Sequence, residues 1–384
     1  MAEMGDIVSY MKNRPLELKR AKEKGIKIVG YFPGNYVPEE IIYAAGAVPV
    51  CLIHASQVTA QAGLAMMPQV ICPFARAQLG ERLLKENPYY SLLDILVAPI
   101  TCQHLKKAAE IWEYSGDLDI FKLGVPHQYG SDFEVEYYIE RLRALRDRLG
   151  SLTGTKVADE KIGKAIEIYN RMRRLFKEIS LMRSIPSSAI NAADFVKLNH
   201  ASFQADPIFI VKSLENIIVS LKNRKPPTKV RPRILLIGPN LSIGDETIFN
   251  MVTEAGGEIV IEEICEGIRY YWSEVENRGD VFESLARGYL VDRIPCAYIR
   301  DSARKRLDFA LGLIRDFNIS GVIWYEVLGC ETYDSESYFF TGEMRKRGIP
   351  VLILESDYSA SSTGQMRTRI EAFMEILRGG TSDA

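Results

Sequence analysis

The stretch Val97–Lys107, VAPITCQHLKK, places Cys102 where an apolar run ends and a helical pattern begins. A second stretch, Val322–Thr332 with the sequence VIWYEVLGCET, places Cys330 at the same kind of junction. Apolar runs of this length are typical of buried strands, and in an open α/β sheet ligands bind outside the carboxyl ends of the strands. The two stretches therefore predict parallel sheets with cysteines at a ligand-binding edge.

The segments around these two stretches follow one order of elements twice. Residues 26–53 have the pattern of a strand, a helix and a second strand, and residues 233–265 repeat it. The cysteines fall at matching places in the two halves, namely Cys51, Cys72 and Cys102 in the first and Cys265, Cys296 and Cys330 in the second. Because strands that alternate with helices form parallel sheets, we expect an α/β fold of two pseudo-repeated flavodoxin- or Rossmann-like lobes.

Four segments are expected along the chain. They are an N-terminal helix (1–24), an N-terminal α/β lobe (25–131), a helical connector or insert (132–230) and a C-terminal α/β lobe (231–384). The connector ends in a linker, KPPTKVRPR at residues 225–233, which is rich in proline and charge. Between Cys51 and Cys72 we expect a loop of small and polar residues, and we expect the closing helix to begin near Gly364.

Composition restricts the classes of partner. Of the 384 residues, 47% are hydrophobic and 26% are charged, which is typical of a soluble globular protein with two domains. A formal charge of −2 without a concentrated basic stripe argues against nucleic acid. The amino-terminal segment lacks a signal-peptide pattern, and the apolar run 41–53 is shorter than the ~20 residues that span a bilayer. We therefore expect no membrane partner and a cytoplasmic location.

Six cysteines in a reducing compartment are metal ligands, catalytic thiols or core residues more often than disulfides. The closely spaced C-x₂₋₄-C pairs of zinc and thioredoxin-like sites do not occur in the sequence. Iron-sulfur clusters can take widely spaced thiolates from strand-to-helix loops. Three cysteines on a four-iron cubane leave one iron open, either for a substrate or for a sulfide shared with a second cubane.

Five segments together resemble the 2-hydroxyacyl-CoA dehydratase and benzoyl-CoA reductase family over nearly the whole chain. They are GNYVPEEIIYAAGAVPV, ICPFARAQLG, PITCQHLKK, VIWYEVLGCETY and ESDYSASSTGQMRTRIEAF. The resemblance implies one cubane on Cys72, Cys102 and Cys330. The three further cysteines depart from the dehydratase pattern and fit the branch of double-cubane cluster proteins, in which six thiolates hold an [8Fe-9S] unit.

The resemblance also implies a mechanism. Such proteins receive low-potential electrons from a separate ATP-hydrolysing reductase, a homodimer with its own [4Fe-4S] cluster, and reduce a small-molecule substrate. The sequence has no G-x-x-x-x-G-K-[ST] phosphate loop, which agrees with ATP hydrolysis by a partner. Two alternatives remain open, a 2-hydroxyacyl-CoA dehydratase subunit with one [4Fe-4S] cluster and an iron-sulfur carrier without catalysis. A homodimer is expected because it is the commonest soluble assembly.

Several polar residues near the cysteines are candidates for proton delivery or anion binding, although each is also compatible with ordinary packing. The candidate catalytic residues are Tyr36, His54, His104 and Glu326, and further candidates are Arg76, Lys106 and Arg300, of which Arg300 matches Arg76 in the repeat. The order of the cysteines leaves their partition open. The repeat favours one triplet per lobe, whereas the dehydratase pattern groups Cys330 with Cys72 and Cys102.

Overall fold

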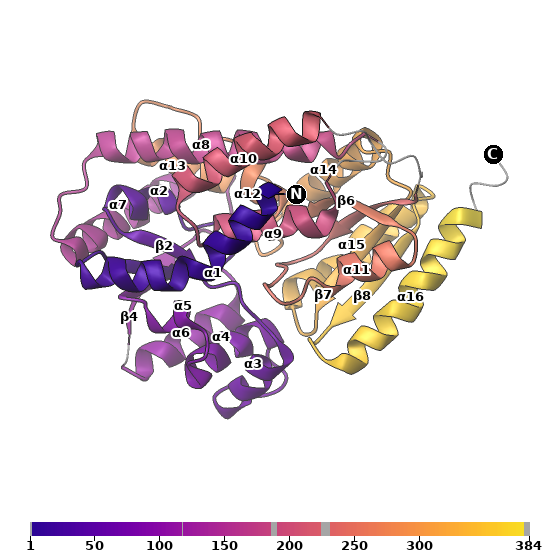
Figure 1. The fold of residues 1–384 in the computed structure, drawn as a ribbon, viewed down its shortest axis with the longest axis horizontal. Coiled ribbons are helices and arrows are strands. Elements are labelled where there is room, and N and C mark those ends of the chain that lie inside the picture. Colours follow the sequence, from indigo (N-terminus) through magenta and orange to yellow (C-terminus); the bar gives the residue numbers. More distant parts are fainter. Residues whose placement is uncertain (1, 117, 186–189, 224–230, 380–384) are drawn as a thin grey trace.

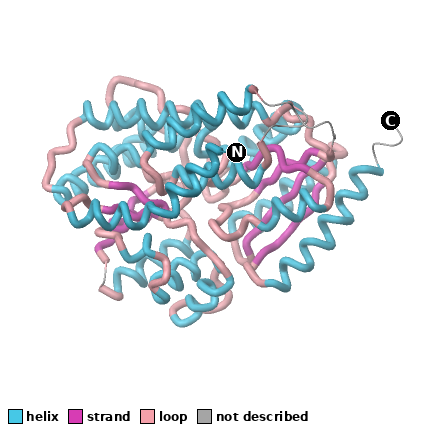
Figure 2. Tube along the Cα trace, in the orientation of Figure 1, coloured by secondary structure: helices cyan, strands magenta, loops and turns pink. Residues whose placement is uncertain are grey.

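The computed structural model of the protein describes residues 2–116, 118–185, 190–223 and 231–379. Its strands form two separate groups, which are the magenta parts of the tube in Figure 2. The first sheet consists of β1 (Ile28–Tyr31), β2 (Val48–Cys51), β3 (Ile95–Ile100) and β4 (Asp119–Gly124), in the order β2-β1-β3-β4. The second consists of β5 (Arg233–Ile237), β6 (Glu258–Glu263), β7 (Gly321–Val327) and β8 (Val351–Ser356), in the order β6-β5-β7-β8.

All strand pairs in both sheets are parallel, and the two orders correspond strand by strand. The predicted pair of repeated α/β lobes is therefore confirmed. In each lobe the second strand along the chain lies on one side of the first strand, and the third and fourth strands lie on the other side. Ligands bind at the point where the strand order reverses in open α/β folds of this kind. The central strands are apolar because both faces are covered, and all seven residues of β7 are buried.

Helices surround each sheet (Figure 1). Those of the first lobe are α2 (Glu39–Ala44), α3 (Gln57–Ala62), α4 (Pro73–Leu84), α5 (Pro88–Ser91) and α6 (Gln103–Tyr114). Those of the second are α11 (Thr247–Glu254), α12 (Ile268–Tyr271), α13 (Val281–Arg287), α14 (Ser302–Asp316), α15 (Glu331–Lys346) and α16 (Ala360–Gly379). The others are α1 (Ala2–Glu23), α7 (Asp132–Thr153), α8 (Asp159–Met182), α9 (Ala192–Ser202) and α10 (Pro207–Lys222).

Two expectations about local structure are wrong. The loop expected between Cys51 and Cys72 contains α3, which begins because the Ser56 hydroxyl accepts the Thr59 backbone N–H in a capping box. The closing helix begins at Ala360 rather than near Gly364, because Ser359 caps its first turn by accepting the Ser362 N–H. Most of the predicted linker, residues 225–230, lies outside the described residues.

The two lobes are joined by backbone hydrogen bonds close to the ends of their sheets. The N–H of Ile243 donates to Ile53 O over 3.0 Å, and the N–H of Ala55 donates to Ile243 O over 3.4 Å. These bonds form a short parallel bridge between His54 and Ile243. The carboxyl ends of both sheets therefore face a common region between the lobes.

Helix α2 adds a buried contact between the lobes. Its Glu39 carboxylate accepts hydrogen bonds from Tyr31 in the same lobe and from Tyr270 of α12 in the other. Its Glu40 pairs with Arg173 of α8 over 2.6 Å, and both of these side chains are fully buried. In Figure 1, α8 and α10 run along one side of the molecule. The connector helices thus fix the first lobe against the second.

Candidate functional site

The cysteines lie at strand ends and helix starts, as the sequence predicts. Cys51 is the last residue of β2, Cys265 follows β6 by two residues, and Cys102 and Cys330 precede the first residues of α6 and α15. Cys72 precedes α4 in the same way, and Pro73 is the first residue of that helix. The backbone N–H at this position has no partner within a helix, so proline, which lacks it, is favoured there. The match of Cys296 to Cys72 is looser, because Cys296 lies in a loop several residues before α14.

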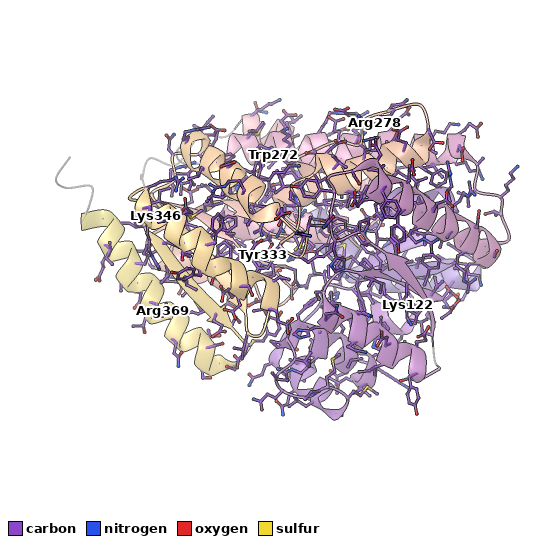
Figure 3. All side chains as sticks on the ribbon, turned by 180° about the vertical axis from the view of Figure 1, so that it is seen from behind. Lys122, Trp272, Arg278, Tyr333, Lys346 and Arg369 are labelled. Atoms are coloured by element: carbon purple, nitrogen blue, oxygen red, sulfur yellow. The ribbon has the colours of Figure 1, made fainter. Side chains whose placement is uncertain are left out.

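Five of the six thiols line one cavity of about 80 Å³ between the two lobes. They are Cys72, Cys102, Cys265, Cys296 and Cys330. Cys51 lines an adjoining cavity that shares Pro33, Gly34 and Glu266 with the first. Tyr333, which also lines the main cavity, lies near the middle of the molecule in Figure 3. The structure therefore brings all six cysteines to one region.

Within this region the thiols form two sets that do not follow the lobes. The Sγ atoms of Cys265 and Cys296 lie 3.9 Å apart. Cys330 of the second lobe instead interacts electrostatically with Cys72 and Cys102 of the first. Cys102 also interacts electrostatically with Cys296, so the two sets adjoin. We call Cys72, Cys102 and Cys330 the first set, and Cys265 and Cys296, with Cys51 in the adjoining cavity, the second.

A glycine permits the close approach of Cys330 to the first lobe. Gly329 has a φ of 71°, a conformation that residues with a Cβ rarely adopt. A Cβ at this position would lie 3.2 Å from Val70 O and 3.7 Å from Cys72 N. The backbone before Cys330 therefore packs directly on the segment that leads to Cys72.

The surroundings of the first set favour neutral thiols, whereas those of the second set favour one thiolate, at Cys296. Burial raises the pKa of Cys72 and Cys330, and it raises that of Cys102 to about 12. The hydrogen bond from the Cys265 thiol, together with the Arg269 guanidinium, lowers the pKa of Cys296 to about 5. Buried thiols become thiolates readily when they bind a metal, so the first set in particular requires a positive partner in order to ionise.

The donor set fits a polynuclear cluster better than a single ion. Among the described residues, no three His, Cys, Asp or Glu side chains approach closely enough to share one metal ion. Sulfurs placed on different walls of one cavity can each bind a different iron of a cluster. The sulfur-rich lining also suits iron rather than hard cations, which prefer oxygen.

Two of the four candidate catalytic residues lie beside these cysteines. His104 lines the main cavity, and its Nδ1 accepts the Cys72 N–H over 3.4 Å. That bond leaves the proton on Nε2, which lies 3.6 Å from a carboxylate oxygen of Glu331. The Tyr36 hydroxyl accepts the Cys296 N–H over 3.1 Å, and burial raises the pKa of Tyr36.

The other two candidate catalytic residues lie outside the lining of the main cavity. His54 is stacked on Tyr89, and burial lowers the pKa of His54 to about 4. The Glu326 carboxylate accepts a 2.6 Å hydrogen bond from the Trp324 indole, which points from the same face of β7. Both side chains take part in packing away from the cavity.

The further candidates do not line the cavity either. The side chain of Arg300 is 70% exposed, whereas Arg76 is buried and donates to the carbonyl oxygens of Ile71 and Ala60. The prediction that Arg300 is equivalent to Arg76 is therefore wrong, because one side chain is exposed to solvent and the other is buried. Lys106 belongs to α6, and its side chain is not part of the cavity wall.

Sequence reasoning missed four buried polar residues around the cysteines. Each has a buried side-chain atom with no hydrogen-bond partner among the described residues; they are Glu266, Arg269 and Arg293, which are buried as a whole, and Asn35, which is partly buried. The Gly34 N–H donates to Glu266 over 3.0 Å, and burial raises the pKa of Glu266 to about 8. Orphaned polar atoms beside a cavity indicate a bound group that satisfies them.

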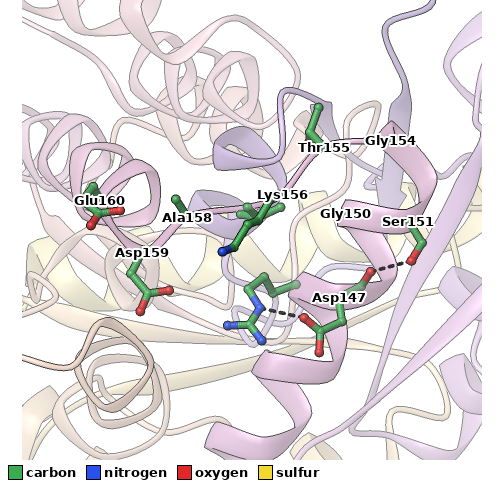
Figure 4. A pocket seen from close by; sticks show the side chains of 11 residues that line it. Asp147, Gly150, Ser151, Gly154, Thr155, Lys156, Ala158, Asp159 and Glu160 are labelled. Carbon is green, nitrogen blue, oxygen red and sulfur yellow. Dashed lines mark hydrogen bonds and ion pairs between the residues drawn. The ribbon is translucent and has the colours of Figure 1, made fainter.

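A larger hollow lies elsewhere and has different chemistry. It has a volume of about 740 Å³ at the turn between α7 and α8 (Figure 4). Its lining contains Asp147, which accepts from Arg146 over 2.8 Å, but no cysteine or histidine of the described residues. We therefore assign the functional site to the cysteine-lined cavity.

None of the helices within the described ranges combines the length and apolar character that crossing a bilayer needs.

Comparison with known proteins places the chain among acyl-CoA dehydratases and reductases. A family model described as "2-hydroxyglutaryl-CoA dehydratase, D-component" matches residues 35–377. The putative dehydratase subunit YjiM of Escherichia coli (strain K12) is 27% identical over 93% of each chain. The (R)-phenyllactyl-CoA dehydratase beta subunit of Clostridium sporogenes is 22% identical over 94% of each chain. A benzoyl-CoA reductase subunit of Thauera aromatica is 23% identical over 89% of this chain and 87% of its own.

Proposed function

The chain belongs to the 2-hydroxyacyl-CoA dehydratase and benzoyl-CoA reductase family, and from this we propose that it is the catalytic iron-sulfur component of a two-component, ATP-dependent reductase. The partner is an ATP-hydrolysing homodimer with a [4Fe-4S] cluster, which delivers low-potential electrons. The substrate is a small molecule that enters the region between the lobes. The chain itself acts as a homodimer in the cytoplasm.

One observation carries this proposal, which is the convergence of six thiols in two sets at the carboxyl ends of both sheets. Three thiolates in each set match the needs of a double-cubane [8Fe-9S] cluster. Cys72, Cys102 and Cys330 would hold one half, and Cys51, Cys265 and Cys296 the other. When bound, the cluster supplies low-potential electrons to the substrate.

The surrounding residues support reduction by handling protons and excluding water. His104 connects the cavity to the surface, because its Nε2 faces Glu331, whose side chain is 73% exposed. A histidine in this position can pass a proton from solvent into the cavity. Tyr36 holds the loop that carries Cys296, through the hydrogen bond to its backbone N–H.

The test is the iron and acid-labile sulfide content of protein purified without oxygen. We expect about eight irons per chain, and loss of half or more in Cys51→Ser or Cys265→Ser. A content of about four irons per chain, unchanged in both variants, would contradict the double cubane.

That contrary result would favour a second function, which one observation supports independently. Cys330 lies with Cys72 and Cys102 rather than with the cysteines of its own lobe. This set alone suits one [4Fe-4S] cluster, and several relatives are named as beta subunits of acyl-CoA dehydratases. A dehydratase subunit would need a second, related subunit, which co-purification from the native organism would detect.

A further inference from the structure

Buried guanidinium groups are distributed unequally around the two sets of thiols. Arg269 and Arg293 line a small cavity together with Cys265 and Cys296. Arg293 also lines the cavity that contains Cys51. The two arginines are only 2% and 3% exposed. The second set of thiols therefore lies against two buried cations.

Arg269 is only partly satisfied by protein groups. Its Nη2 donates to Gly238 O over 2.9 Å, and its Nε lies 3.4 Å from a Glu263 oxygen. The same Glu263 is also paired with Arg306. The Nη1 of Arg269 has no hydrogen-bond partner among the described residues. One donor of Arg269 is thus available to a group in the cavity.

Arg293 is less compensated still. Its Nη1 donates to Asn35 O over 3.3 Å, and its guanidinium carbon lies 3.7 Å from the centroid of the Tyr289 ring. Its Nε and Nη2 have no hydrogen-bond partner, and within the described ranges no carboxylate forms an ion pair with it. The carboxyls of Glu39 and Glu266 line the same cavity, but burial raises the pKa of each, to about 7 and about 8. A buried charge without a full counter-charge is costly, so the free donors of Arg293 favour an anionic group in this cavity.

The Tyr289 ring fixes the orientation of the Arg293 guanidinium. The Tyr289 hydroxyl donates to Glu40 over 2.7 Å, and Glu40 is itself held by Arg173. The ring of Tyr289 therefore cannot move away from the guanidinium without breaking buried hydrogen bonds. A side chain preorganised in this way holds its free donors in one direction.

The first set of thiols has a different environment. The buried guanidinium of Arg76 lies close enough to Cys72 to oppose the effect of burial on the pKa of that thiol, but it donates to the carbonyl oxygens of Ile71 and Ala60 and does not line the cavity. His104 is the basic side chain that lines the cavity on this side. The two sets therefore differ in the hydrogen-bond donors that face the cavity, since only the second set has cavity-lining guanidinium groups with free donors among the described residues.

We infer that Arg293 and Arg269 donate hydrogen bonds to the half of the cluster held by Cys51, Cys265 and Cys296, and that they raise its reduction potential above that of the other half. Hydrogen bonds to cluster sulfurs and nearby positive charge both stabilise the reduced form. The inference rests on the proposed function. It assigns the higher reduction potential to the half of the cluster beside the arginines. Electrons from the ATP-hydrolysing partner are held on the arginine side.

The experiment compares the loaded full-length protein with Arg293→Met, Arg293→Lys and the control Arg300→Met. Arg300 loses the same charge four residues from Cys296, but from a side chain that is 70% exposed. Iron content is measured first, and midpoint potentials are then measured by redox titration followed by electron paramagnetic resonance. We expect the iron content per chain to be unchanged in all three variants. The first midpoint potential should shift to a more negative value in Arg293→Met and by a smaller amount in Arg293→Lys. It should not shift in Arg300→Met.

Two results would overturn the inference while leaving the proposed function intact. One is a fully loaded Arg293→Met protein with an unchanged potential, and the other is an equal shift in Arg300→Met. If Arg293→Met does not hold iron, Arg293→Lys decides, because lysine keeps the charge but lacks the planar set of donors. An unchanged potential in that variant overturns the inference. A wild-type protein without about eight irons per chain instead contradicts the proposed function itself.

Discussion

The thiol sulfurs of Cys265 and Cys296 lie 3.9 Å apart, although 31 positions separate the two residues in the sequence. One comes from the end of a strand and the other from a long loop. Their hydrogen bond divides the acidity of the pair unequally, since the pKa of Cys296 is lowered and that of Cys265 is raised. The pair therefore contains a nucleophile and a nearby partner sulfur.

This proximity predicts the behaviour of the iron-free protein toward oxidants. We expect two equivalents of ferricyanide to join Cys265 and Cys296 in a disulfide, because a thiolate is already in contact with a thiol; the pair loses the one thiol proton and two electrons, one to each ferricyanide ion. Peptide mass spectrometry after alkylation identifies the linked pair. A disulfide between Cys72 and Cys102 in its place would show that the close contact does not exist in solution.

Tyr36→Phe tests the hydrogen bond that holds the Cys296 loop. The variant removes the only hydroxyl that accepts this buried N–H among the described residues, at a cost of about 1–3 kcal/mol in the free energy of unfolding. Thermal denaturation measures the loss as a lower Tm. Tyr338→Phe removes a hydroxyl from a side chain that is 88% exposed and should leave the Tm unchanged. Equal effects in the two variants would argue against a specific role for Tyr36.

Gly80→Ala tests the contact between α3 and α4. A Cβ at Gly80 would overlap the Thr59 carbonyl, so the helices must separate, with a loss of about 1–3 kcal/mol or more in stability. Gly163→Ala in α8 is the matched control, because a Cβ there meets no atom within 4 Å. That control should gain about 0.5–1 kcal/mol, as expected for alanine in a helix. Denaturant unfolding distinguishes the opposite signs.

Asp245→Asn tests a buried carboxyl group through pH. Burial raises the pKa of Asp245 from 3.8 to about 7 in the folded state. Between these two values the folded protein keeps a proton that the unfolded chain has released, so stability falls as pH rises, by up to about 1.4 kcal/mol per unit. The variant removes this dependence and still accepts the hydrogen bond from Tyr325.

The measurement for Asp245→Asn is the difference in Tm between about pH 5.5 and pH 7.5, for wild type and variant. The wild type should lose more stability than the variant over this interval. A variant whose Tm changes as steeply as that of the wild type would show that another group controls the pH dependence.

The alternation of strands and helices along the chain and the positions of the cysteines at their junctions could be predicted, because both depend on local patterns. A buried strand is mostly apolar, as in β7 where Glu326 is the one charged residue, and the residues after it lie at the edge of the sheet. The same reasoning failed for Glu326, because proximity to Cys330 in the sequence does not determine which face of the strand a side chain occupies. It failed for α3 because one serine cap starts a helix in an otherwise ordinary polar segment.

The arginines near the site could not be predicted for a different reason. Arg269 and Arg293 are arginines, a residue type that is exposed in most proteins unless it is paired, so nothing in the sequence alone indicates that they are buried. Their burial depends on Tyr289, Glu263 and the thiols, which come from separate segments of the chain. Only the tertiary arrangement brings these groups together.

The grouping of Cys330 with Cys72 and Cys102 has a consequence for biosynthesis. During translation the first lobe leaves the ribosome with two of these three thiols, and the third follows more than two hundred residues later. The newly made first lobe therefore cannot form the complete site by itself. If the proposed cluster is bound, its insertion would have to wait until the last third of the chain has folded against the first, so a loaded centre would mark a chain that has been synthesised and folded through to its second lobe.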